Sequence, residues 1–99
     1  MDAGVDRHEW ESEMSALEEQ LADSPAEALP ELDALVGRIL EETGIDDPDV
    51  VSEFDAAREI AQAVERGSDE ISPGDVAAAI NGYRAVFDTV VATRADLGP

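Results

Sequence analysis

The chain has 99 residues, with 25 Asp or Glu, 6 Arg, no Lys and a formal net charge of −19. This length suits one helical domain over residues 1–99, with frayed ends expected at 1–5 and 95–99. The absence of Cys excludes disulfides, thiolate nucleophiles and Cys-based zinc sites, and the absence of a basic patch disfavours direct contact with a nucleic-acid backbone.

The first predicted helix spans about residues 6–22. Asp6, followed three residues later by Glu9, forms a signal for a helix start. Apolar residues then recur at spacings of four, three and four, which gives a narrow seam with acids on the other faces. Such a helix is expected to be the outermost element and the one most suited to pair with another molecule. Its predicted interaction face consists of Trp10, Met14, Leu17 and Leu21.

The second predicted helix spans about residues 30–43. A capping signal at Ser24 favours an earlier start, but Pro30 follows too soon for an undisturbed helix. We prefer a short turn over 25–29, and the alternative is a helix that kinks at Pro30. Gly44 with an apolar residue after it predicts the end of this helix.

The segment Ala22-Asp23-Ser24 resembles the Asp-Ser-Leu motif of acyl carrier proteins, which are acidic four-helix proteins. That resemblance implies a phosphopantetheine-bearing serine at Ser24. The sequence departs from the motif because Pro25 stands where the family has an apolar residue and no Gly precedes Asp23. We therefore interpret Ser24 as a helix cap.

The third predicted helix spans about residues 48–66. Asp47 and Pro48 are suited to its cap and first position, and Gly67 marks its end. The connection to the next helix is short, so the two are expected to be antiparallel neighbours.

The fourth predicted helix spans about residues 73–94 and has the widest apolar face. Ser72 and Asp75 form a capping box. Gly82 in the middle of the helix costs about 1 kcal/mol relative to Ala, so we expect a close crossing with the third helix to compensate. The apolar face contains Val76, Ile80, Tyr83, Val86, Phe87, Val90 and Val91.

Together these elements predict an all-α fold, a small antiparallel bundle of four helices. Two alternatives stay open: a three-helix core whose first helix reaches out to a partner, and a dimer whose apolar faces are shared. Because the second helix is short, apolar surface is expected to remain uncovered near one end of the bundle.

Few residues of the chain suggest chemistry. The densest acidic cluster could attract a hard cation such as Mg²⁺ or Ca²⁺, but it does not match the alternating ligands and central Gly of an EF-hand loop and is explained by capping of the third helix. Its members are Asp46, Asp47, Asp49 and Glu53. The single His8 lies in the first turn of an exposed helix and is expected to face solvent. We expect no cofactor.

The arginines are expected to pair within their own helices, at spacings of three or four residues. The predicted pairs are Arg38 with Glu41 or Glu42, Arg58 with Asp55, and Arg84 with Asp88.

The acidic composition is the strongest signal in the sequence. Abundant Asp, Glu, Ala and Val without Lys resembles the composition of proteins from salt-adapted haloarchaea. Exposed carboxylates repel one another at low salt and are screened in concentrated salt, so high KCl is expected to stabilise the fold. The alternative is that the acids are the function, as in an acidic mimic or antitoxin that covers a basic partner.

These observations predict a non-enzymatic protein that acts by binding another protein or by self-association. No apolar run approaches the 18 or so residues of a membrane span, and the first residues lack the pattern of a signal peptide. We therefore expect no membrane association and a cytoplasmic location. The rival prediction from another class is a metal- or metabolite-binding enzyme that uses carboxylates alone.

Overall fold

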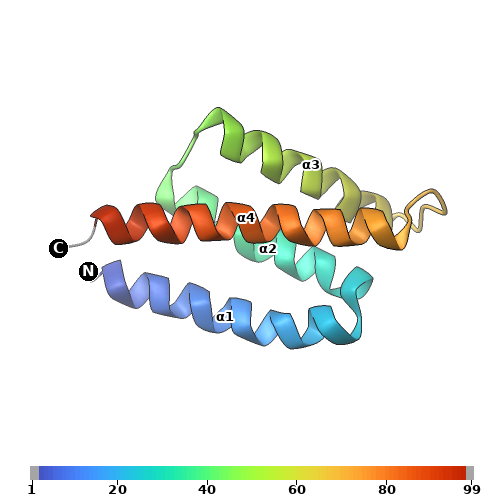
Figure 1. The fold of residues 1–99 in the computed structure, drawn as a ribbon, viewed down its shortest axis with the longest axis horizontal. Coiled ribbons are helices and arrows are strands. Elements are labelled where there is room, and N and C mark those ends of the chain that lie inside the picture. The colour runs from blue at the N-terminus through green and yellow to red at the C-terminus, as the bar shows by residue number, and fades with distance from the viewer. Residues whose placement is uncertain (1–2, 98–99) are drawn as a thin grey trace.

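The computed structural model describes the backbone of residues 3–97 and the side chains of residues 8–93. Four helices account for most of this part of the chain (Figure 1), and residues 3–97 contain no strand. The helices are α1 (Ala3–Asp23), α2 (Pro25–Thr43), α3 (Pro48–Glu65) and α4 (Pro73–Leu97). The predicted all-α fold with four helices is confirmed.

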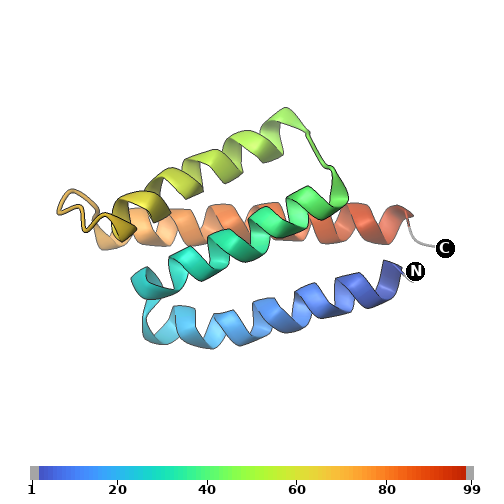
Figure 2. The ribbon, with the colours of Figure 1, turned by 180° about the vertical axis from the view of Figure 1, so that it is seen from behind.

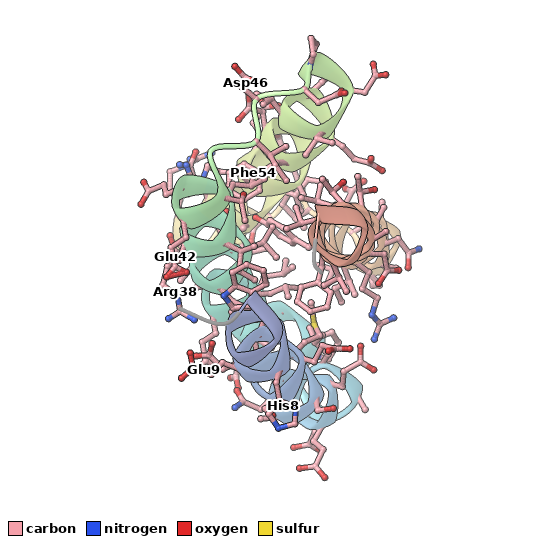
Figure 3. The ribbon with its side chains drawn as sticks, turned by 90° about the vertical axis from the view of Figure 1, so that its left-hand side faces the viewer. His8, Glu9, Arg38, Glu42, Asp46 and Phe54 are labelled. Atoms are coloured by element: carbon pink, nitrogen blue, oxygen red, sulfur yellow. The ribbon has the colours of Figure 1, made fainter. Side chains whose placement is uncertain are left out.

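Consecutive helices run in opposite directions, so α1 and α3 point one way and α2 and α4 the other (Figures 1 and 2). Seen end-on in Figure 3, α2 and α4 lie in the middle, with α1 and α3 on opposite sides of them. Within the described residues, α1 packs mainly on α2, touches α4 lightly and does not contact α3. The first helix is therefore the most peripheral element.

The first helix begins earlier than its capping signal indicated. Ala3 is already helical, so Asp6 lies inside α1 and does not mark its start. The segment 3–5 contains no proline, and although Gly4 disfavours a helix it keeps its backbone N–H, so the helix can extend through the segment. The last turn of α4 likewise includes residues 95–97, while residues 1–2 and 98–99 lie outside the described part.

The second helix begins at Pro25 and continues through Pro30, in place of the expected turn over 25–29. Pro30 lacks an N–H and so forgoes one hydrogen bond to the preceding turn. Burial offsets that loss, because Ala28 and Leu29 in the same turn have exposed fractions of 1% and 0%. Packing against the rest of the core therefore overrides the local signal for a later start.

The remaining helix ends match their sequence signals. Asp47 caps α3 by accepting a hydrogen bond from the N–H of Asp49 at 2.9 Å. Ser72 and Asp75 form the capping box of α4 through two reciprocal bonds of 3.0 and 3.1 Å. Gly44 ends α2 with φ at 68°, a left-handed conformation in which glycine is favoured.

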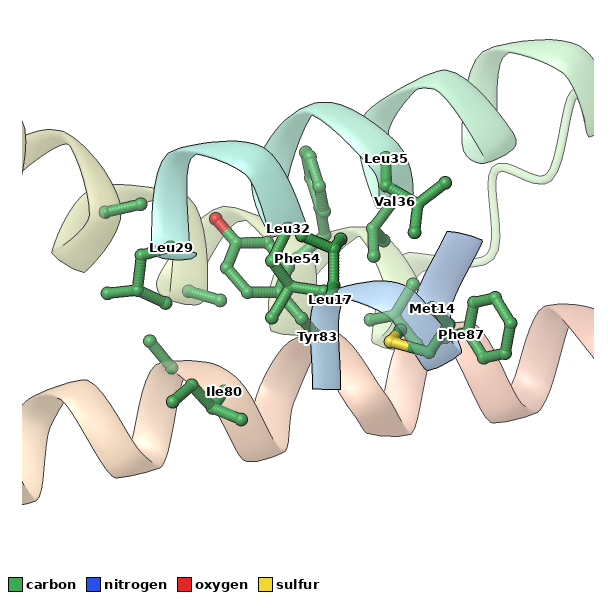
Figure 4. Close-up of a cluster of buried hydrophobic side chains, with 14 of the residues drawn as sticks. Met14, Leu17, Leu29, Leu32, Leu35, Val36, Phe54, Ile80, Tyr83 and Phe87 are labelled. Carbon is green, nitrogen blue, oxygen red and sulfur yellow. The ribbon is translucent and has the colours of Figure 1, made fainter. Parts of the chain in front are cut away.

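The core fills the space between α2 and α4 and extends to the inner faces of the other two helices (Figure 4). Tyr83, Leu29 and Leu32 are its largest fully buried side chains. No charged side chain in residues 8–93 is fully buried. Among the described carboxylates only Asp33 and Asp75 are partly buried, and the others are exposed.

Candidate functional site

A polar network joins three helices at the centre of the molecule. Asp33 of α2 accepts a hydrogen bond from the hydroxyl of Tyr83 on α4 at 2.6 Å. The same carboxylate accepts two bonds from the guanidinium of Arg58 on α3, at 3.1 Å from Nε and 3.2 Å from Nη2. Tyr83 is fully buried, whereas the side chains of Asp33 and Arg58 are 19% and 44% exposed. We call these three residues the Asp33 network.

Two aromatic contacts support the Asp33 network. The guanidinium of Arg58 lies over the ring of Phe54, 4.6 Å from the ring centroid. Phe54 in turn meets Tyr83 edge-on, with ring centroids 5.8 Å apart. Gly37 of α2 leaves room for this arrangement, because a Cβ there would lie 3.2 Å from Arg58 Nη2 and 3.3 Å from Phe54 Cζ. The geometry thus depends on a glycine of the facing helix.

The electrostatics of the Asp33 network favour a structural role. Burial raises the pKa of Tyr83, and its hydrogen bond to Asp33 raises it further. The bond to Asp33 also raises the pKa of Arg58. At neutral pH the phenol is therefore a neutral donor and the guanidinium a cation, so neither can act as a base or nucleophile. The network fixes how α2, α3 and α4 meet.

The best candidate for a binding site is an apolar pocket at one end of the bundle, which we call the end pocket. It lies where α2 begins, α3 ends and α4 begins, and its volume is about 580 Å³. Val76 and Ile80 on its inner side are buried, whereas Val64 and Ile71 are half-buried. The lining consists of Ser24, Pro25, Ala26, Glu27, Val64, Ser68, Ile71, Ser72, Pro73, Val76, Ala77 and Ile80.

Two of the three serine hydroxyls that line the end pocket are already engaged. The hydroxyl of Ser68 accepts from the N–H of Glu70 at 3.3 Å, and that of Ser72 accepts from the N–H of Asp75. Ser24 occupies the cap position of α2, where its hydroxyl makes no cap hydrogen bond to the described backbone. The pocket therefore offers mainly aliphatic surface, which suits an apolar group.

The sequence predicted uncovered apolar surface near one end of the bundle but did not say which end. That prediction rested on a short second helix, whereas α2 has 19 residues and α3 has 18, so the end pocket does not arise from a short α2. The lining itself was not predicted, because it includes Ile71 from the connection between α3 and α4. The apolar character of this residue, in a segment that is otherwise polar, is the signal that could have identified it.

The predicted interaction face is buried within the chain itself. Trp10, Met14, Leu17 and Leu21 have exposed fractions of 4% to 9% and pack in the core. Figure 4 shows Met14 and Leu17 among residues of the neighbouring helices. This face becomes available to a partner only if α1 leaves α2, and its role in binding stays a prediction.

The acidic cluster around the start of α3 is used for capping. Asp47 accepts the cap hydrogen bond described above, and Asp46, Asp49 and Glu53 are exposed. Within the described residues, no three His, Asp or Glu side chains are grouped so that they could hold a metal ion. His8 is exposed on α1, as Figure 3 shows.

The three arginines with predicted partners pair between helices, in contrast to the sequence prediction. Arg38 forms an ion pair with Glu13 of α1, and Arg84 forms one with Glu18 of α1 at 3.0 Å. Arg58 binds Asp33, as described above. The expected partners lie only three or four residues away in the same helix, but the observed pairs across a helix interface also follow the packing of the apolar stems.

Comparisons with known proteins give no relative from which a function could be inferred. The chain matches no protein family, no curated protein and no solved structure. Within the described residues, no helix has the length and apolar character to cross a membrane.

Proposed function

We propose that this protein is a non-enzymatic interaction protein, which binds another protein or a second copy of itself through apolar surface. The end pocket is the observation that carries the proposal. It presents half-buried aliphatic side chains on a molecule whose described carboxylates are nearly all exposed. An opening of this size in an otherwise charged surface is typical of a binding site.

A pair of alanines on α4 gives a matched test. Ala77 lines the end pocket, whereas its neighbour Ala78 lines a different surface between α3 and α4, and both are exposed. Ala77→Gln places a long polar side chain in the pocket without changing the net charge, and Ala78→Gln makes the same change outside it.

The measurements are light scattering after size-exclusion chromatography and affinity capture, both in molar KCl. We expect an oligomer or an identified partner that is lost in Ala77→Gln and kept in Ala78→Gln. A monomer that captures no protein, or an association that both variants retain, would contradict a role for the end pocket.

The carboxylate surface is proposed to be an adaptation to concentrated salt. With 25 acids against 6 arginines, charge repulsion opposes the compact state when it is unscreened. We expect the helical circular-dichroism signal and the melting temperature to increase between about 0.1 and 2 M KCl. A circular-dichroism signal and a melting temperature that do not change with KCl would refute salt adaptation. They would favour the alternative in which the acids themselves recognise a basic partner.

A further inference from the structure

We propose that the end pocket receives apolar side chains presented by a positively charged segment of a partner protein. This inference rests on the proposed function and adds the chemistry of the partner. Its first basis is the size and lining of the pocket. A volume of about 580 Å³ is in the range of small-molecule sites and accommodates more than one large side chain. Val76 and Ile80 form the buried inner surface, with Val64 and Ile71 toward solvent.

The second basis is the charge around the pocket. Glu27 lines it, and exposed acids adjoin the lining residues along the chain: Asp23 before Ser24, Glu65 after Val64, and Asp69 with Glu70 before Ile71. Arg66 is the single cation among residues 61–80, and it is exposed. Opposite charge on a partner lowers the energy of approach, whereas like charge raises it.

The third basis is that carboxylates of the chain itself already lie at the N-termini of the two helices that begin near the pocket. The N-terminus of α4 is closed by the capping box of Ser72 and Asp75. The first turn of α2 carries Glu27. Free helix N–H groups would attract an anion, but a ligand with a negative group would meet these carboxylates first. The site therefore favours an apolar group flanked by cations.

Three synthetic peptides test this assignment on the full chain. Each is an alanine-based helix of about 15 residues with two Leu one turn apart, a spacing that puts both on one face. The residues flanking the two Leu are Arg in the first peptide, Gln in the second and Glu in the third. Each peptide is titrated into the isotopically labelled protein, and amide chemical shifts give the site and the dissociation constant.

The titrations are run at about 0.3 and 2 M KCl, where the Debye length falls from roughly 6 to 2 Å. At the lower salt we expect the Arg peptide to bind about tenfold or more tightly than the Glu peptide, with the Gln peptide between them. The shifts should map to the lining residues, and the difference should shrink at 2 M KCl. Ala77→Gln should weaken binding of the Arg peptide severalfold, and Ala78→Gln should leave its dissociation constant unchanged.

Other outcomes separate this inference from the proposed function. Equal affinity of all three peptides, lost in Ala77→Gln, would overturn the charge assignment and leave the proposed function standing. Binding of the Arg peptide that Ala77→Gln does not weaken would show attraction to the acidic surface at large and overturn the inference. Binding of no peptide would overturn it too. If the lining amides instead shift on dilution without peptide, a second copy covers the pocket, which supports self-association and overturns the cationic partner.

Discussion

The two sides of the bundle are held together in different ways. Among the described residues, the contact of α1 with the rest of the molecule is an apolar seam with the ion pairs Arg38–Glu13 and Arg84–Glu18 at its margin, and the four side chains of these two pairs are 41% to 49% exposed. The junction of α2, α3 and α4 combines apolar packing with the Asp33 network, whose tyrosine is fully buried. Exposed ion pairs add little to stability, whereas a buried donor must keep its acceptor.

The difference indicates that α1 is the least secured helix. Apolar contacts attract without demanding one geometry, but three donor groups that are hydrogen-bonded to one carboxylate fix how the helices meet. We expect α1 to open at a lower free energy than the other helices, which amide hydrogen exchange measures directly. Identical opening free energies for all four helices would refute this comparison.

The largest expected effect comes from weakening the seam of α1. Leu17 is 9% exposed, and Leu17→Ala should cost about 3 kcal/mol, as for other buried leucines. Opening of α1 and complete unfolding should both become easier by the same amount, because both break the contacts of Leu17. Hydrogen exchange should therefore show an unchanged difference in opening free energy between the amides of α1 and the slowest-exchanging amides, which report complete unfolding. A smaller difference in opening free energy would show that the contacts of Leu17 break only when the other helices unfold as well.

Removing the carboxylate of Asp33 should cost less stability than Leu17→Ala and should weaken the junction of α2, α3 and α4 without affecting α1. Asp33→Ala leaves the buried hydroxyl of Tyr83 without its acceptor, and we expect a loss of about 2 kcal/mol in urea unfolding. The opening free energy of α1 should be unchanged while the free energy of complete unfolding falls, so the difference between the two should become smaller. Glu13→Ala, which removes only an exposed ion pair, is the control and should cost less than about 0.5 kcal/mol. Equal losses in the two variants would show that the network adds nothing beyond a surface pair.

The protonation of Tyr83 should make stability fall at high pH. Because the folded chain raises the pKa of this phenol above its ordinary value of 10.0, folding favours the protonated form. This contribution is complete below pH 10 and is lost as pH rises further, by at most about 1.4 kcal/mol per pH unit. Tyr83 is the only tyrosine, so its phenolate absorbance can be followed together with unfolding. Tyr83→Phe should remove this slope, and an unchanged slope would assign it to other groups.

Two glycines give the smallest and most local test. At Gly82 a Cβ would lie 3.5 Å from Ala57 Cβ and 3.7 Å from the carbonyl of Glu53, which are ordinary contacts. Gly82→Ala should therefore raise stability by about 0.5 to 1 kcal/mol through helix propensity. Gly37→Ala should lower stability, because Arg58 and Phe54 would have to move. Melting temperatures that rise equally in both variants would show that the Asp33 network tolerates displacement.

The sequence predicted the helices well because helix formation is largely local. The caps at Asp47 and Ser72 and the stop at Gly44 depend on hydrogen bonds between residues a few positions apart, and each formed where its signal lay. Gly82 does face Ala57 and Glu53 of α3, but a Cβ at this position would make only ordinary contacts, so the packing does not supply the close crossing that was expected to compensate the cost of this glycine. The start of α2 was misplaced because burial of Leu29 competes with the effect of Pro30, and burial is not a local property.

What the sequence by itself determined is therefore the number of helices, most of their ends and the acidic character of the surface. Only the tertiary structure decided that Arg58 and Tyr83 meet at Asp33, which lies 25 and 50 residues away from them along the chain. It also decided that the predicted face of α1 is buried, and that Val64 and Ile71 border a common pocket with Ala26. The physical reason is that capping and periodicity act within one turn of helix, whereas partners across helices follow from how four apolar faces pack together.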